Sequence, residues 1–210
     1  MSNLPVIAFL NKMTDLILLN VIYIIFCLPI VTIGAATTAM YYVCIVSIRQ
    51  GDGYVWKRFL KSFRDNFKQA TIIWLPMLVI IVLLGFDLFF WYALGTVFAK
   101  IMFVISAIVA FAIGIVCLYV FPVLAKLEGG IKATIKNAAA FAIGYFPYTI
   151  VLILFTVGFC YANYVSLGMN AITVFIGFAL LAYMKSFFIY KVMMNHIDER
   201  YDDFLDELSD

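Results

Sequence analysis

The chain has 210 residues, of which 66% are hydrophobic and 12% are charged, with a formal net charge of +2. Soluble domains average about 45–50% apolar and about 25% charged residues, and a globule of this length would expose too much area to water for a mean hydropathy of +1.09. The composition therefore predicts a membrane protein and excludes a secreted disulfide scaffold, a nucleic-acid-binding domain, a disordered chain and a soluble enzyme.

The first hydrophobic region runs without a charge over residues 16–48. As one helix it would be about 50 Å long, against a bilayer core of about 30 Å. Pro29 and Gly34 lie in its middle, and proline removes a backbone donor and disfavours helix in the residue before it. We predict a first helix that begins near Pro5 and ends at this break, and a short second helix over residues 34–49.

The next segment, residues 54–69, reads YVWKRFLKSFRDNFKQ and predicts an amphipathic helix. Its apolar face would hold Trp56, Phe59, Leu60, Phe63 and Phe67. Its opposite, mostly cationic face would hold Lys57, Arg58, Lys61, Arg64, Asp65 and Lys68. Such a helix lies in the headgroup plane, where it could act as an elbow that positions the next span. Alternatively, Trp56 and the five cations bind a cytoplasmic partner.

Four later stretches are each long and apolar enough to span a bilayer: residues 71–92, 101–125, 138–167 and 171–192. Basic residues gather in three regions that alternate with the loop at Lys100 and the turn at 166–170: residues 49–68, residues 126–136 and the stretch after the last span. The positive-inside rule places these three regions, and the C-terminus, in the cytoplasm. We predict six spans, which place the N-terminus inside as well, and five spans are the alternative. With five, the stretch after Pro29 is re-entrant or strongly tilted and the N-terminus is outside.

Small residues at membrane depth favour close helix packing. The pairs Gly34/Thr38 and Ala35/Ala39 are spaced four apart, and so are Ala110/Gly114 and Ala140/Gly144. We expect packing inside the bundle, and contact with another membrane subunit is the alternative.

Among the polar residues inside predicted spans, four are candidates for a role at membrane depth: Asn20, Asp87, Asn163 and Lys185. Asn20 can bond across helices, Asp87 falls near the outer edge and Lys185 lies toward the inner end of the last span. Because Asp87 and Lys185 sit at opposite depths, we expect no direct pair. An interfacial or packing role for Asp87 competes with a role in binding an ion or solute.

The last segment, residues 196–210, carries seven carboxylates and one arginine. Its apolar residues recur at helical spacing, which predicts an acidic amphipathic helix. It either folds against the basic 54–69 helix or contacts another protein, with Asp202, Asp203 and Phe204 as candidate contacts. We therefore divide the chain into one transmembrane bundle domain, residues 1–195, and a cytoplasmic tail, residues 196–210.

Residues that would support catalysis or metal binding are few. His196 is the only histidine, the four cysteines lack metal or redox spacing, and no phosphate-binding loop or hydrolase motif is present. We predict no enzyme, no cofactor, no metal site and no nucleic-acid partner.

Two stretches carry a family likeness: LPIVTIGAATTAMYYV at residues 28–43 and GYVWKRFLKSFRDNFKQ at residues 53–69. Together with Leu19-Asn20 they resemble the YesL family of integral membrane proteins from Gram-positive bacteria. The resemblance implies an all-α polytopic bundle in a bacterial cytoplasmic membrane. Members of the family commonly lie beside genes for carbohydrate ABC importers, and no active-site residues are established for it.

Three hypotheses follow from the residues and from this resemblance. The first is a non-enzymatic accessory component that binds the membrane subunits of a carbohydrate ABC importer. The second is an independent small-solute transporter or channel, which would need a polar cavity lined by residues such as Asn20, Asp87 and Asn163. The third is a membrane-anchored regulator of sugar uptake. Whether the protein binds a sugar directly stays open at this point.

Overall fold

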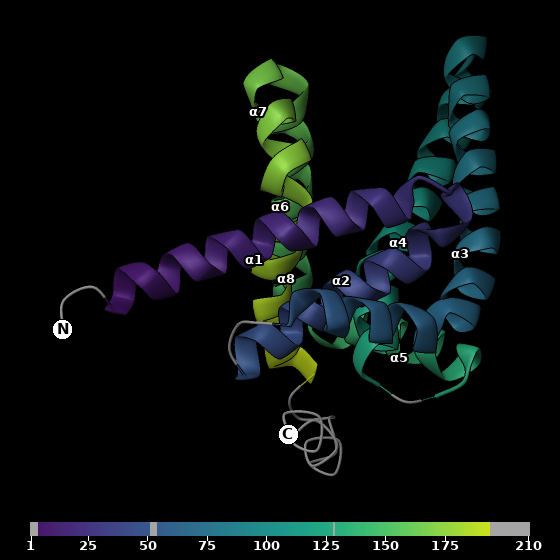
Figure 1. Cartoon of the computed structure of the whole chain (residues 1–210). Helices are drawn as coiled ribbons and strands as arrows, with labels where there is room; N and C mark the ends of the chain where they lie inside the picture. The colour runs from purple at the N-terminus through teal and green to yellow at the C-terminus, as the bar shows by residue number, and fades with distance from the viewer. Residues whose placement is uncertain (1–3, 51–53, 128, 194–210) are drawn as a thin grey trace.

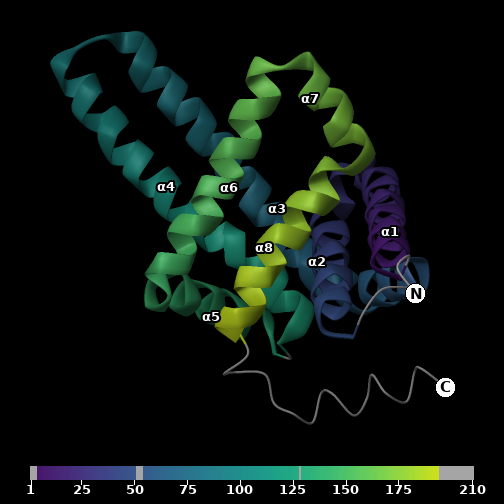
Figure 2. The ribbon, with the colours of Figure 1, turned by 90° about the vertical axis from the view of Figure 1, so that its left-hand side faces the viewer.

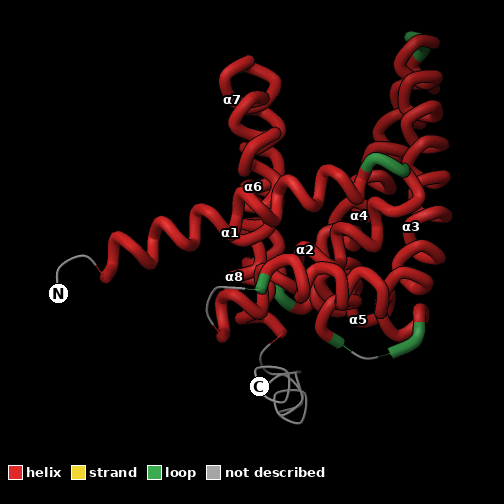
Figure 3. Tube along the Cα trace, viewed as in Figure 1, coloured by secondary structure: helices red, strands yellow, loops and turns green. Residues whose placement is uncertain are grey.

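The computed structural model describes residues 4–50, 54–127 and 129–193, and its elements within these ranges are helical (Figure 1). Six of its helical segments are long and apolar enough to cross a membrane, which confirms the predicted all-α polytopic class. Figure 3 shows how little loop separates them. The α-helices are α1 (Leu4–Cys27), α2 (Ile33–Gln50), α3 (Val55–Leu94), α4 (Val97–Lys126), α5 (Ile131–Gly144), α6 (Phe146–Val165), α7 (Leu167–Ile172) and α8 (Phe178–Met193).

The break between α1 and α2 lies at the predicted proline. A 3-10 turn over Ile30–Thr32 follows Pro29, and the hydroxyl of Thr32 donates to the carbonyl of Pro29 at 2.7 Å. The same hydroxyl also donates to the carbonyl of Phe26 in the last turn of α1. One threonine thus satisfies carbonyls on both sides of the break, which a helix end in lipid needs.

Helix α3 joins two segments that the sequence suggested were separate. The basic segment and the following span form one helix of 40 residues, which continues through Pro76. In Figure 1 the helix runs along the lower part of the molecule and then rises beside α4. It ends at Gly95, whose φ of +64° is a conformation that glycine adopts readily.

The predicted span over residues 138–167 is wrong in its first part. Residues up to Gly144 belong to α5, and the membrane-spanning α6 begins at Phe146 after an interruption at Tyr145. Pro147 in the first turn of α6 explains the interruption, because proline is tolerated there but has no amide proton to donate to the carbonyl of Ile143, as one continuous helix would require.

The last predicted span consists of three helical pieces. The short α7 leads into a π-helix over Thr173–Gly177, and α8 follows directly. The hydropathy pattern gave no sign of the π-helix, because an extra residue in a helical turn leaves the apolar composition unchanged.

The helices form a packed base from which two hairpins rise. The α3–α4 and α6–α8 hairpins point the same way and diverge from each other (Figure 2), whereas α1 runs across them (Figure 1). The core lies at the base, where residues 39–46 of α2 and residues 119–126 of α4 are all buried. In the rest of α4 the only buried residue is Ala99.

Candidate functional site

The N-terminal half of α3 packs onto the base through a narrow stripe. Val55, Phe59, Ser62 and Ala70 are buried, and they share one side of the helix. The predicted apolar face is therefore only partly used: Phe59 is fully buried, whereas Trp56 and Phe67 are 50% and 39% exposed. Ser62 and Ala70 were not predicted at the contact from the sequence. Close approach of two helices requires small side chains, and hydropathy does not report side-chain size.

Aromatic rings tie this half of α3 to α1. The ring of Phe26 meets the rings of Trp56, Phe59 and Phe63 with centroids 6.4, 5.3 and 4.8 Å away, all edge-on. Phe67 continues the row, 5.5 Å from Phe63. Edge-to-face pairs are a favoured aromatic geometry, so these rings hold the first half of α3 against α1 in one orientation.

The cations of α3 lie away from the buried stripe. We call Lys57, Arg58, Lys61, Arg64 and Lys68 the basic face. Lys57, Arg64 and Lys68 are exposed, and Arg58 and Lys61 are half-buried. Lys132 and Lys136 of α5 are also exposed, at the same end of the molecule. A basic face with an aromatic flank fits either the headgroup layer of a bilayer or an acidic protein segment.

A second feature is a buried polar junction between α1 and the π-helix. Asn20 has no exposed surface. Its amide group donates to the carbonyls of Thr173 and Val174 at 3.2 and 2.7 Å, and its oxygen accepts from the backbone amide of Ala179 at 2.9 Å. These are main-chain groups at and just after the π-helix, so Asn20 satisfies the backbone where the regular bonding pattern changes.

Thr173 and Asn163 extend the polar junction to α6. The Thr173 hydroxyl donates to the side-chain oxygen of Asn163 at 2.7 Å, and the Asn163 amide donates to the carbonyl of Phe159 at 2.9 Å. A Cβ on Gly177 would lie 2.9 Å from the Thr173 hydroxyl, so the π-helix needs a glycine there. Two predicted polar residues, Asn20 and Asn163, thus meet through Thr173, which the sequence reasoning did not single out.

Asp87 lies apart from this junction, on the outer part of the α3–α4 hairpin. Its carboxylate accepts from the Trp91 indole at 2.9 Å and from the hydroxyl of Ser106 on α4. The carboxylate therefore joins the two helices of the hairpin, which favours the packing role over the ion-binding role.

Lys185 is 5% exposed on α8. No hydrogen bond or ion pair joins it to another residue within the described ranges. Lys12 of α1, in contrast, donates to Ser47 at 2.8 Å and lies 4.4 Å from the ring centre of Tyr183. Lys185 thus contacts neither Asp87 nor the polar junction.

Gly34 lies where α2 meets α3. A Cβ at this position would be 2.6 Å from Cβ of Trp74 and 3.0 Å from the carbonyl oxygen of Ala70. The indole of Trp74 donates to the carbonyl of Ile30 at 2.7 Å, beside the same contact. Ala35, Thr38 and Ala39 are fully buried on α2. Gly114 and Gly144 meet nothing within 4 Å, so the small-residue pairs predicted there make no close contact at their glycines.

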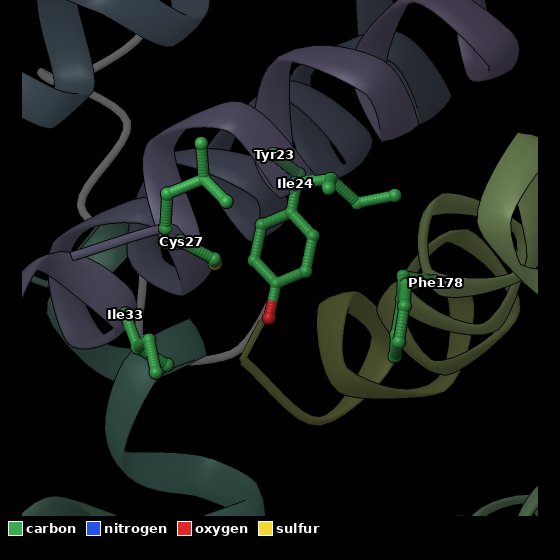
Figure 4. A pocket seen from close by; sticks show the side chains of 6 residues that line it. Tyr23, Ile24, Cys27, Ile33 and Phe178 are labelled. Carbon is green, nitrogen blue, oxygen red and sulfur yellow. The ribbon is translucent and has the colours of Figure 1, made fainter. Parts of the chain in front are cut away.

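A groove of about 380 Å³ opens between α1, the start of α2 and the start of α8 (Figure 4). It is lined by Tyr23, Ile24, Cys27, Leu28, Ile33 and Phe178. The Tyr23 hydroxyl lies 3.4 Å from the hydroxyl of Thr37. None of Asn20, Asp87 and Asn163 lines this groove, so the proposed polar residues do not form a cavity here.

The last set of predicted contact residues lies outside the described residues. Asp202, Asp203 and Phe204 belong to the C-terminal segment that the structure does not describe. Among the described residues, no three His, Cys, Asp or Glu side chains gather in a way that could hold a metal ion.

Comparison with known proteins gives one match. A family model described as "Protein of unknown function, DUF624" matches residues 16–88, from within α1 to within α3. No curated protein and no solved structure matches the chain. The matched residues include both stretches that resemble the YesL family, the contact of Gly34 with Trp74, and the basic face.

Proposed function

We propose that the protein is a non-enzymatic membrane component that binds the membrane subunits of a carbohydrate ABC importer. The importer is suggested by the resemblance to the YesL family. The mode of action, contact between helices in the membrane, is suggested by the geometry of the hairpins.

The observation that carries the proposal is the unburied outer part of the α3–α4 hairpin. Phe86 and Phe89 are 70% and 71% exposed, and Ala99 is the only buried residue of α4 before Tyr119. The hairpin diverges from α6–α8 in Figure 2, and Asp87 with Ser106 ties its two helices together. A preformed, laterally free hairpin is suited to packing against helices of another membrane protein.

The proposal is tested by affinity purification in mild detergent from the native host grown on complex glycans. We expect the permease subunits of a carbohydrate importer to be recovered in amounts near that of the tagged protein. Phe86→Ala with Phe89→Ala should lower that recovery severalfold. Tyr164→Ala with Leu167→Ala, at the similarly exposed tip of α6 and α7, is the matched control and should leave the recovery unchanged.

Recovery of the tagged protein alone, from cells in which the importer is abundant, would contradict the proposal. In that case solute uptake by purified protein in vesicles separates an independent transporter from a regulator that uses only the cytoplasmic surfaces.

A further inference from the structure

The charges of the chain are divided unevenly between its C-terminal segment and the rest. Residues 196–210 carry seven carboxylates against one arginine, whereas the preceding 195 residues carry thirteen Lys and Arg against five Asp and Glu. An acidic segment beside an anionic leaflet is repelled by it, so this segment needs a basic protein surface to lie near the membrane.

The described chain ends at the same end of the molecule as the basic face. Met193, the last residue of α8, has no exposed surface and lies in the core at the base. In both Figure 1 and Figure 2 the end of α8, the first half of α3 and α5 lie at the lower end of the molecule. The chain therefore enters its acidic segment close to the level of the basic face.

Three cations of the basic face are accessible to an acidic segment. Lys57, Arg64 and Lys68 are exposed, and they form no ion pair with any residue within 4–50, 54–127 or 129–193. Trp56 and Phe67 are exposed beside them. The acidic segment has a matching apolar set: Ile197, Tyr201, Phe204, Leu205 and Leu208.

The lengths of the two segments also match. As a helix, residues 196–210 would be about 22 Å long, and the first sixteen residues of α3 are about 24 Å long. An extended residue covers at most about 3.5 Å, so the two residues between Met193 and residue 196 act as a short tether. A short tether gives the segment a high effective concentration at any surface within its reach.

From this charge complementarity, tether and match of length, we infer that the acidic segment 196–210 docks on the basic face of α3 in its own chain. The docked segment covers the cations that would otherwise contact anionic headgroups or a cytoplasmic partner. A partner that binds the basic face must then displace the segment, which makes the segment a built-in competitor for that surface.

Hydrogen–deuterium exchange of the full-length protein tests this inference. The protein is reconstituted at one copy per nanodisc in phosphatidylcholine, which removes anionic lipid and second copies as docking partners. We expect amides of residues 197–208 to exchange at least about tenfold more slowly than the same amides in a free synthetic peptide of residues 196–210. Reversal of the basic face with Lys57→Glu, Arg64→Glu and Lys68→Glu should bring exchange to within about twofold of the free peptide.

Two further variants separate docking from misfolding and from general charge. Lys132→Glu, Lys136→Glu and Lys191→Glu change the charge by the same amount on exposed residues of α5 and α8, and should leave the protection in place. Adding Asp202→Lys, Asp203→Lys and Glu207→Lys to the variant with the reversed basic face should restore the protection of residues 197–208. The inference would be overturned if residues 197–208 of the unmodified protein exchanged as fast as in the peptide. It would also be overturned if the α5 and α8 variant lost as much protection as the variant with the reversed basic face.

Discussion

Asn20 uses its amide group and its oxygen on main-chain partners in another helix, at 2.7 to 3.2 Å. In lipid no water can replace these partners, so the side chain fixes both the depth and the rotation of α1 against the π-helix. Thr173 adds a second bond through its hydroxyl to Asn163. The polar junction therefore defines how three helices align, although it contains only three side chains.

Asn20→Ala should destabilise the fold. The change removes the side-chain bonds to two carbonyls and one backbone amide, and hydrogen bonds between membrane helices contribute about 0.6 to 1.7 kcal/mol each. We expect a loss of about 2–4 kcal/mol in the free energy of unfolding, measured by denaturant titration in mixed micelles. Asn170→Ala, on the exposed side of α7, is the control and should change little. Equal stability of the two variants would contradict the role given to Asn20.

At the scale of whole helices, the sequence predicts that a helix is present better than it predicts where the helix begins and ends. The break at Pro29 was predictable because proline changes the backbone itself. The continuity of α3 was not, because the pattern changes from amphipathic to wholly apolar at residues 69–71, although Ala70 between them favours helix. In the membrane, lipid-facing and core-facing positions are equally apolar, so patterning does not report which face is buried.

The buried stripe of α3 illustrates the same limit for the candidate site. Hydropathy identified Phe59 but not the small Ser62 and Ala70, whose contribution is to let α3 approach the base. The polar residues of the junction were visible in the sequence as Asn20 and Asn163. Their meeting through Thr173 depends on the π-helix, which has no compositional signature.

Gly34→Ala should separate α2 from α3. Its new Cβ would overlap Cβ of Trp74 at 2.6 Å, and neither backbone can move without disturbing the indole bond to Ile30. We expect a loss of about 1–3 kcal/mol in the free energy of unfolding, as is typical of overpacking. Gly114→Ala makes the same chemical change on α4 where nothing lies within 4 Å, and should be neutral or stabilising by up to about 1 kcal/mol. A neutral Gly34→Ala would show that the α2–α3 contact is more compliant than these distances imply.

The molecule as a whole is tightly packed at one end and open at the other. Residues 119–126 of α4 are all buried, whereas the earlier part of the same helix is half-buried or exposed at every residue but Ala99. An open arrangement of apolar hairpins leaves lipid or another membrane protein to cover them. The proposed partner contact belongs to this open end, and the inferred tail docking belongs to the packed end.

The charge distribution predicts which end faces the cytoplasm. In a variant without native cysteines, Gly168→Cys at the tip of the α6–α8 hairpin should react with a membrane-impermeant maleimide in intact cells. Gly130→Cys, before α5, should react only after the cells are permeabilised, because the basic regions stay inside. Both glycines are exposed, so the labelling of the two cysteines differs only by the side of the membrane on which each lies. The opposite labelling pattern would invert the orientation and place the basic face outside.

The polar junction also has a consequence for the order of events during synthesis. Asn20 leaves the ribosome early, but its carbonyl partner Thr173 is 153 residues further along the chain. At about 5–20 residues per second, roughly 8–30 s pass before that partner is made. An amide without partners is costly in hydrocarbon, so we expect α1 to spend this interval where its amide reaches water or another polar partner. We therefore expect α1 to reach its final place only after the π-helix has been made.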